Sequence, residues 1–386
     1  MYIQRIKLKN WRNFTDIDVQ LRERVFLIGP NACGKSNFLD VFRFLRDIAD
    51  PDGGGLQRAV KERGGVLKLR SLYARRYPTI EIEVHLGADL SSPPQWVYSI
   101  GIKNQKGGDN PPILAWEKVW KNNCLILNRP DKDDEEDVKL LTQTALEQLR
   151  FNRDFRDIQV FFQSTLYLHL VPQLLRYPDT FESATLRADP FGKNFLERVI
   201  KTPDKTRKAW LSKIEDALKV AVPQMKQLTD IKDDMGHPHL EAVYEHWRPK
   251  AGKQREDQFS DGTLRLIALF WSLLETKNSI LLLEEPELSL NAAIVAKLPA
   301  IIARLQKGKK SQVILSTHSA DLLSDPGIDG REVIMMQPKK EGTEARVVSS
   351  IPEIRQLLEA GLTISETALP QTAPPNIQQL ELELWS

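Results

Sequence analysis

The chain has 386 residues, of which 41% are hydrophobic and 27% charged, with a formal net charge of +2; these values are ordinary for a globular protein of one or two domains. No run approaches 18 apolar residues, the first residues lack the apolar stretch of a secretory signal, and two cysteines cannot build a disulfide framework. These observations exclude a membrane-spanning protein and a disulfide scaffold, and we expect a cytoplasmic location.

Charge is distributed unevenly along the chain. Residues 1–80 contain 16 Lys or Arg and 8 Asp or Glu, an excess of 8 positive charges. Such a segment can attract nucleotides or nucleic acid, or it can be an ordinary solvated surface, and composition does not decide between the two. Residues 131–137, DKDDEED, are acidic and are expected to form a solvated loop.

The first part of the chain, residues 1–137, is predicted to be one lobe. Alternation and a short apolar run predict strands within residues 1–28, and helical spacing of apolar residues predicts a helix over 38–50. Further strand-like segments predict an antiparallel sheet, namely residues 80–84, 96–103, 113–120 and 124–128.

The middle of the chain, residues 138–235, is predicted to be a helical insertion, because apolar residues recur at helical spacing and prolines divide the pattern into short helices. One of these helical segments is 161–175.

From 236 to 365 strands and helices alternate, with a helix expected after the loop at 259–263 and another over 291–306. Residues 366–386 are a Pro-rich tail that ends in LELELW.

The segment from Gly29 to Ser36, GPNACGKS, fits the phosphate-binding pattern GxxxxGK[ST]. Glycines let the backbone wrap around phosphates, whose charge is held by N–H groups and by the N-terminus of the following helix. A predicted strand precedes this segment and a predicted helix follows it, as the pattern requires. We therefore expect ATP to bind here, with Lys35 on the β and γ phosphates and Ser36 on Mg²⁺.

Two acids follow an apolar strand in the segment LLLEEPE. The strand would place Glu284 and Glu285 at the carboxyl edge of a sheet, where α/β proteins bind ligands. Glu284 would then hold Mg²⁺ and Glu285 would polarise the attacking water. The alternative is a strand that ends in an acidic turn without catalytic function.

Two further segments have both a structural and a functional interpretation. In FSDGT, Ser260 can be a helix N-cap, but a hydroxyl and free N–H groups at a helix start also suit a γ-phosphate. In STHS, His318 follows a predicted strand; it can be structural, or it can contact the γ-phosphate or position water.

Together with the opening LKNWRNF, these four motifs resemble the ABC-type ATPases, and among them the RecF, SMC and OLD-like class. The resemblance covers most of residues 1–48 and 255–320. It implies an α/β fold, a P-loop NTPase of the ABC-ATPase head type with an antiparallel β-lobe and a helical insertion. The implied domains are lobe I (1–137), the insertion (138–235), lobe II (236–365) and the tail (366–386).

The resemblance also implies roles for individual residues. Glu285 would be the catalytic base and His318 the switch, while Ser260 and Gly262 would bind the γ-phosphate held by the other subunit. Ser36 and Glu284 would hold Mg²⁺. The remaining nucleotide-binding candidates are Arg12, Gly29, Asn31, Gly34, Lys35 and Asn37. Residues 288–291 resemble the D-loop that crosses the dimer, and Gln57 is a candidate for the Q-loop residue.

Three residues depart from the pattern of that class. Glu284 stands where many ABC ATPases have Asp, Asn291 replaces the His or Asp often seen in the D-loop, and Cys33 replaces a small residue of the phosphate-binding loop.

By this resemblance the chain is an ATP-hydrolysing subunit that forms a head-to-tail homodimer, or a higher oligomer, on ATP. Only 68 residues follow His318, too few for a nuclease domain of about a hundred residues, so we expect any nuclease to be a separate effector chain. The subunit would control a DNA-processing or antiviral defence effector. The alternatives are a RecF-like repair factor that binds DNA and a nucleotide-gated scaffold with little turnover; a transporter ATPase fits the motifs poorly.

Overall fold

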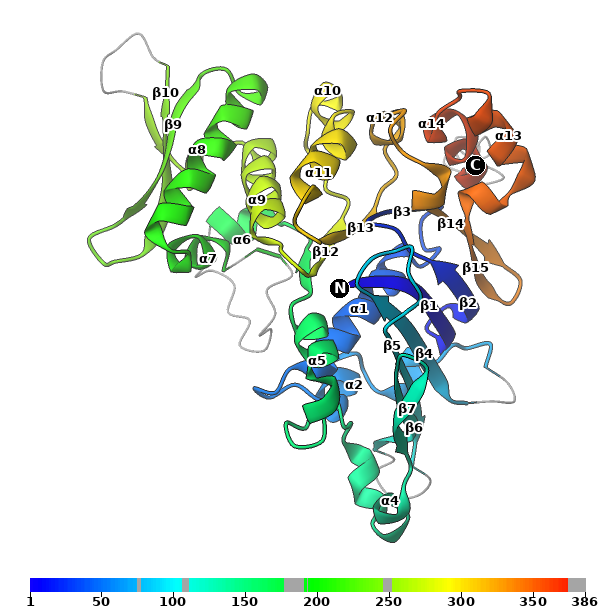
Figure 1. Ribbon diagram of the computed structural model, residues 1–386. Helices are drawn as coiled ribbons and strands as arrows, with labels where there is room; N and C mark the ends of the chain where they lie inside the picture. Colours follow the sequence, from blue (N-terminus) through cyan, green and yellow to red (C-terminus); the bar gives the residue numbers. More distant parts are fainter. Residues whose placement is uncertain (75–77, 106–110, 177–190, 193, 246–251, 374–386) are drawn as a thin grey trace, which may run out of the picture.

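The computed structural model describes residues 1–386 except 75–77, 106–110, 177–190, 193, 246–251 and 374–386 (Figure 1). Within the described ranges, no helix combines the length and the apolar character needed to cross a membrane. Two large sheets and one small sheet are present, and the two large ones determine where the candidate site lies.

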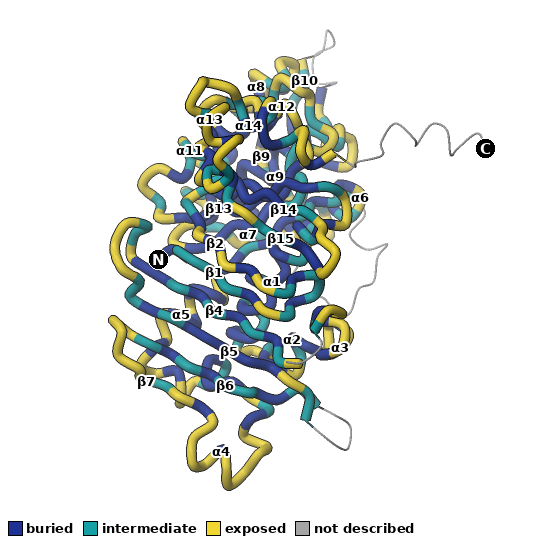
Figure 2. Tube along the Cα trace, turned by 90° about the vertical axis from the view of Figure 1, so that its right-hand side faces the viewer, coloured by how far each residue is buried: buried dark blue, intermediate teal, exposed yellow. Residues whose placement is uncertain are grey.

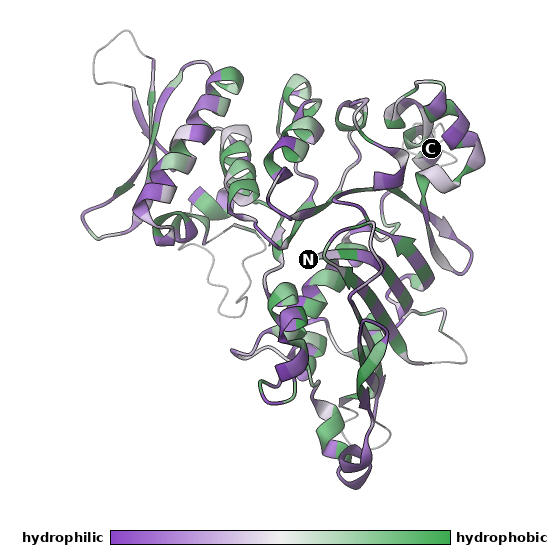
Figure 3. Ribbon diagram, in the orientation of Figure 1, coloured by the Kyte–Doolittle hydropathy of each residue, from purple (hydrophilic) through white to green (hydrophobic). Residues whose placement is uncertain are grey.

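The first large sheet is antiparallel and has the order β2-β1-β4-β5-β6-β7. Its side chains alternate between a buried and a solvated face, and Figure 3 shows the matching bands of hydrophobic and hydrophilic residues along the strands. The strands are β1 (Tyr2–Trp11), β2 (Phe14–Gln20), β4 (Ile80–Gly87), β5 (Trp96–Asn104), β6 (Pro112–Lys121) and β7 (Cys124–Arg129). The predicted antiparallel sheet is therefore confirmed.

The second large sheet has the order β15-β14-β3-β13-β12-β8 and is parallel from β14 to β8. Parallel strands bring their carboxyl ends to one edge, so segments that are distant in the sequence meet there. The strands are β3 (Arg24–Ile28), β8 (Leu166–Leu168), β12 (Ile280–Glu284), β13 (Gln312–Ser316), β14 (Val333–Lys339) and β15 (Gly342–Val347).

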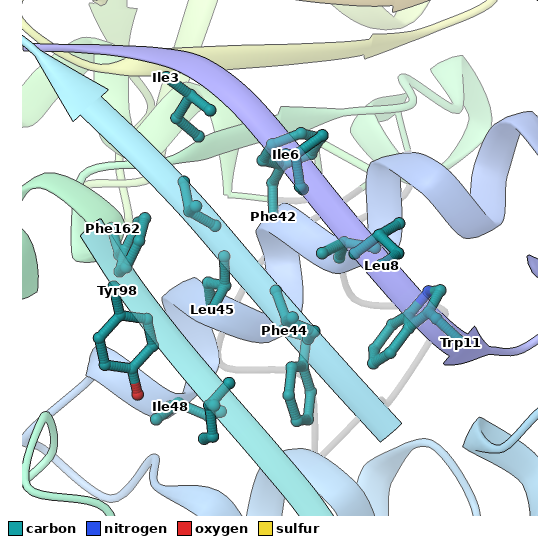
Figure 4. Packing of buried hydrophobic residues seen from close by; sticks show 14 of the residues in the cluster. Ile3, Ile6, Leu8, Trp11, Phe42, Phe44, Leu45, Ile48, Tyr98 and Phe162 are labelled. Atoms are coloured by element: carbon teal, nitrogen blue, oxygen red, sulfur yellow. The ribbon is translucent and has the colours of Figure 1, made fainter. Parts of the chain in front are cut away.

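Helix α1 (Lys35–Ala49) packs against the buried face of the antiparallel sheet. Its apolar side chains, including Phe42 and Phe44, meet Ile6, Leu8 and Trp11 of β1 (Figure 4). Figure 2 shows the strands mostly in the colours of buried and intermediate residues, while outer segments such as α4 are exposed. This packing fixes the start of α1, and with it the phosphate-binding loop, relative to both sheets.

The remaining elements surround these two sheets. They are α2 (Leu56–Glu62), α3 (Val66–Leu69), α4 (Lys132–Glu136), α5 (Arg156–Gln163), α6 (Pro172–Arg176), α7 (Phe195–Lys201), α8 (Asp204–Ala221), β9 (Met225–Lys232), β10 (Pro238–Tyr244), β11 (Lys253–Arg255), α9 (Asp261–Glu275), α10 (Ala292–Val295), α11 (Leu298–Gln306), α12 (Ala320–Leu323), α13 (Pro352–Glu359) and α14 (Ile364–Thr367). Strands β9, β10 and β11 form the small antiparallel sheet beside α8 (Figure 1).

Three predictions about local structure are wrong. The segment 161–175 is not helical throughout, because Leu166–Leu168 pairs with β12 as strand β8. The helix expected over 291–306 is divided into α10 and α11, and Pro299 lies in the first turn of the second. The acidic segment 131–137 is not a simple solvated loop, because it forms the short capped helix α4 and buries Asp134 against Arg129.

The domain boundaries deduced from the sequence stay a prediction. Helices α5 to α8 lie in the predicted insertion, and strands β8 and β9 lie there too. The predicted tail begins at residue 366, within α14, which ends at Thr367, and residues 374–386 lie outside the described part.

A buried ionic cluster supports the far end of the antiparallel sheet. The Glu117 carboxylate, which is 0% exposed, accepts hydrogen bonds from Tyr98, from Arg129 and from the N–H groups of Ala145 and Leu146. Glu117→Ala would leave the buried Arg129 without part of its counter-charge. We expect a loss of about 3–5 kcal/mol in the free energy of unfolding, measured by urea denaturation. Glu62→Ala, which removes an exposed ion pair with Arg58, is the control and should leave the unfolding midpoint nearly unchanged.

Candidate active site

The phosphate-binding loop (residues 29–36) connects β3 to α1, as predicted. Gly34 has a φ of 100°, and a Cβ there would lie 2.2 Å from the side-chain nitrogen of Asn13, so a larger residue does not fit. Lys35 is 7% exposed, and its Nζ donates to the carbonyl oxygens of Gly29 at 3.0 Å and Pro30 at 3.2 Å. The ammonium group therefore lies across the loop, where phosphate oxygens would be held.

Asn13 is a supporting residue of the loop that sequence reasoning missed. Its Nδ2 donates to the carbonyl of Cys33 at 2.8 Å, and its Oδ1 accepts from Asn37 Nδ2 at 2.7 Å. The candidate Asn37 thus contacts the β1–β2 turn, while Asn31 lies exposed at the tip of the loop. Cys33 is buried, and burial raises the pKa of its thiol.

Glu284 is the last residue of β12 and Glu285 follows it, and the two side chains have different partners. Ser36 Oγ donates to Glu284 Oε1, so the hydroxyl and the carboxylate predicted to share Mg²⁺ are in direct contact. Glu285 has a φ of 45°, and its Oε1 lies 3.8 Å from Nε2 of His318. A positive φ is uncommon for a residue with a side chain, and such residues cluster at functional sites.

His318 reaches the site from the end of β13. Burial, and then the positive charge of Lys35, lower the pKa of its imidazole, so the ring is neutral at neutral pH. The backbone N–H of His318 and the Thr317 hydroxyl both donate to Glu287 Oε1, at 3.3 and 2.5 Å. Glu287 therefore connects the switch segment (316–319) to residues 284–287.

The signature segment (259–263) begins α9. The Ser260 hydroxyl accepts from the N–H of Thr263 at 3.2 Å, so it is an N-cap. A Cβ on Gly262 would lie 2.6 Å from the carbonyl oxygen of Ser289, so the helix start packs directly on the D-loop candidate. In the described part of the chain, no hydrogen bond or ion pair joins Ser260 or Gly262 to residues 29–37. The start of the signature helix therefore lies against residues 288–291 of its own chain.

Arg12 lies in the β1–β2 turn with a φ of 50°, and its guanidinium donates to Asp40 of α1 at 2.6 Å. Asp40 is buried, and burial by itself would raise the pKa of its carboxyl. The guanidinium groups of Arg63 and Arg12 nevertheless hold that pKa below the usual value. The structure therefore places Arg12 beside the helix that follows the phosphate-binding loop.

Gln57 does not lie with the acids. Its amide donates to the carbonyl oxygens of Pro112 and Thr142, both at 2.7 Å, within the antiparallel lobe. Strand β8 lies beside the acids instead: Tyr167 donates to Glu284 Oε2, and His169 Nδ1 lies 3.4 Å from the Glu284 carbonyl oxygen. The alternation in LYLHL was the available signal for this strand.

The donor set fits a magnesium ion. A hydroxyl and one carboxylate beside a phosphate-binding loop are typical, because Mg²⁺ keeps several waters and takes phosphate oxygens as further ligands. The described residues contain no group of three or more His, Cys, Asp or Glu that could hold a metal ion by themselves.

The fold and these motifs define an ABC-type ATPase head of the RecF and SMC class. The chain belongs to the family described as "AAA domain, putative AbiEii toxin, Type IV TA system", whose model matches residues 24–325. This finding and the two-sheet architecture confirm the fold class and the family resemblance.

Individual relatives are distant. The DNA replication and repair protein RecF of Synechocystis sp. (strain ATCC 27184 / PCC 6803 / Kazusa) is 28% identical over 87 residues, which are 22% of this chain and 23% of RecF. The SMC head bound to the C-winged helix domain of ScpA superposes with a TM-score of 0.53 at 13% identity, covering 90% of this chain and 98% of that one. The SMC head domain from Thermotoga maritima superposes with a TM-score of 0.49, also at 13% identity, and the match covers 90% of this chain and 99% of that one. At 13% identity, the match to the ScpA-bound SMC head shows the fold alone.

Proposed function

We propose that the protein binds ATP with Mg²⁺ and hydrolyses it. The observation that carries this proposal is the contact of Ser36 with Glu284, 248 residues away, beside the buried ammonium of Lys35. Lys35 and the loop N–H groups would hold the phosphates, and Ser36 and Glu284 would hold Mg²⁺, which offsets phosphate charge when bound. Glu285 would orient the attacking water and accept its proton, and the neutral His318 would position that water.

We further propose that the site is completed by a second copy in a head-to-tail dimer. Gly262 packs against Ser289 of its own chain, and Ser260 caps the helix that begins there, so the signature segment lies against the D-loop candidate of the same chain. A helix start with free N–H groups suits a γ-phosphate, and a two-fold arrangement would supply one such start to each loop.

Light scattering on Glu285→Gln tests this assembly. With ATP and Mg²⁺ the mass should rise from 44.1 kDa to that of a dimer, because nucleotide would bind but not turn over. Ser260→Arg in the same background should keep the monomer mass, since it removes the signature contact without touching residues 29–36. A mass that does not change with ATP although ATP binds would contradict nucleotide-driven dimerisation.

The cellular role we propose is control of a separately encoded effector in DNA processing or antiviral defence, such as a nuclease, in the cytoplasm. The family description, which includes toxins of toxin–antitoxin systems, supports this role. The trapped Glu285→Gln dimer is the bait for co-purification with the product of a neighbouring gene. Equal recovery with ATP and with ADP would argue against nucleotide control.

A RecF-like repair factor is the second candidate, favoured by the match to RecF. The charges of lobe I weaken its case for DNA binding, because the outer face of the antiparallel sheet pairs Lys7 with Glu83 and Lys9 with Glu81 across strands. Salt-dependent preference for gapped over intact duplex DNA would support this candidate. A scaffold with little turnover is distinguished by the ATPase rate of the wild-type protein.

A further inference from the structure

Tyr167 is a buried polar side chain that none of the motifs includes. It lies in the middle of β8, paired in register with Leu282 of β12, and is 6% exposed. Its hydroxyl donates to Glu284 Oε2, while Glu284 Oε1 accepts from Ser36. Each oxygen of the candidate metal-binding carboxylate therefore has its own protein donor.

The ring of Tyr167 is held as well as its hydroxyl. The guanidinium of Arg43 lies 4.4 Å from the ring centroid, and a cation over an aromatic face is favourable. Arg43 in turn lies 3.7 Å from Asp40, the carboxylate that also binds Arg12. Contacts thus run without a break from the β1–β2 turn through α1 and Tyr167 to Glu284.

We propose that Tyr167 is a positioning residue for the metal-binding carboxylate. By occupying Oε2, its hydroxyl keeps the Glu284 side chain in the rotation that turns Oε1 toward Ser36 and the phosphate-binding loop. Groups that hydrogen-bond a metal-binding carboxylate orient it and raise the affinity of the site. This inference rests on the proposed function, because it assumes that Glu284 and Ser36 hold Mg²⁺ with bound ATP.

The test is the binding of a fluorescent ATP analogue, mant-ATP, to Tyr167→Phe at increasing Mg²⁺ concentration. Phenylalanine keeps the ring under Arg43 and removes only the hydroxyl. We expect affinity in EDTA to equal that of the wild type, and the Mg²⁺ concentration at the binding midpoint to rise by about 10- to 100-fold. Because the readout is binding, it does not depend on turnover.

Tyr98→Phe is the matched control. Tyr98 is also a buried tyrosine that donates to a buried glutamate, Glu117 at 3.0 Å, but it lies in the antiparallel lobe. Its loss should lower the melting temperature and leave the Mg²⁺ midpoint unchanged. An unchanged midpoint in Tyr167→Phe would overturn the positioning role, and so would an equal shift in both variants. Failure of the wild type to bind mant-ATP would instead refute the proposed function.

Discussion

Glu285→Gln is expected to lower the rate of ATP hydrolysis by about 10²–10³-fold, which is within the usual contribution of a general base. Glutamine has nearly the same shape, so the backbone N–H of residue 285 should still donate to the Ser316 carbonyl, now 3.1 Å away. The side-chain amide of the glutamine cannot accept a proton from water at neutral pH. The affinity for mant-ATP should therefore stay at the wild-type value, and steady-state phosphate release measures the loss.

The control for this change is Glu353→Gln, an exposed glutamate in the first turn of α13. It makes the same chemical substitution away from the site and should hydrolyse ATP at the wild-type rate. A Glu285→Gln protein that retains most of its turnover would show that another group activates the water.

The phosphate-binding loop and the acids could be predicted from sequence because each is a local signal. Residues 29–36 carry their glycines, lysine and serine in one short pattern, and Glu284 follows a short apolar run whose length favours a buried strand. The meeting of Ser36 with Glu284 also follows, since parallel strands end at the same edge of a sheet. Strands β1 and β2 of lobe I were visible for a similar reason, in the alternation of their residues.

Contacts that depend on tertiary pairing could not be predicted. Strand β8 has three residues, and the brief alternation in LYLHL lies within a segment whose overall spacing is helical. Pairing with β12 decides its conformation, so the contact of Tyr167 with Glu284 could not be foreseen. Asp134 looked solvated within an acidic run, yet Arg129 binds it in the interior. The excess of positive charge in lobe I also does not reveal that Lys7 and Lys9 form ion pairs with glutamates on a neighbouring strand.

Mixing two inactive variants is expected to restore ATP hydrolysis if the site is shared between subunits. Lys35→Ala removes the ammonium group from the phosphate-binding loop, and Ser260→Arg blocks the signature segment. In a mixed dimer the intact loop of the Ser260→Arg subunit would face the intact signature segment of the Lys35→Ala subunit. One of the two sites is then complete, and the other lacks both elements.

The size of the recovery follows from the symmetry of the dimer. Random pairing would make half of the dimers mixed, each with one complete site of two, which corresponds to about a quarter of wild-type activity if the sites work independently. Because Ser260→Arg is not expected to dimerise with itself, a larger share of mixed dimers would raise this value toward about one half. Each variant alone should stay near background, and an equal mixture of Lys35→Ala with Glu285→Gln should not recover, because those two changes damage the same half of the site. If Ser260 acted on the loop of its own chain, no mixture would restore hydrolysis. Recovery in the first mixture and not in the second therefore assigns Ser260 to the site of the opposite subunit, and leaves Lys35 and Glu285 together in one chain.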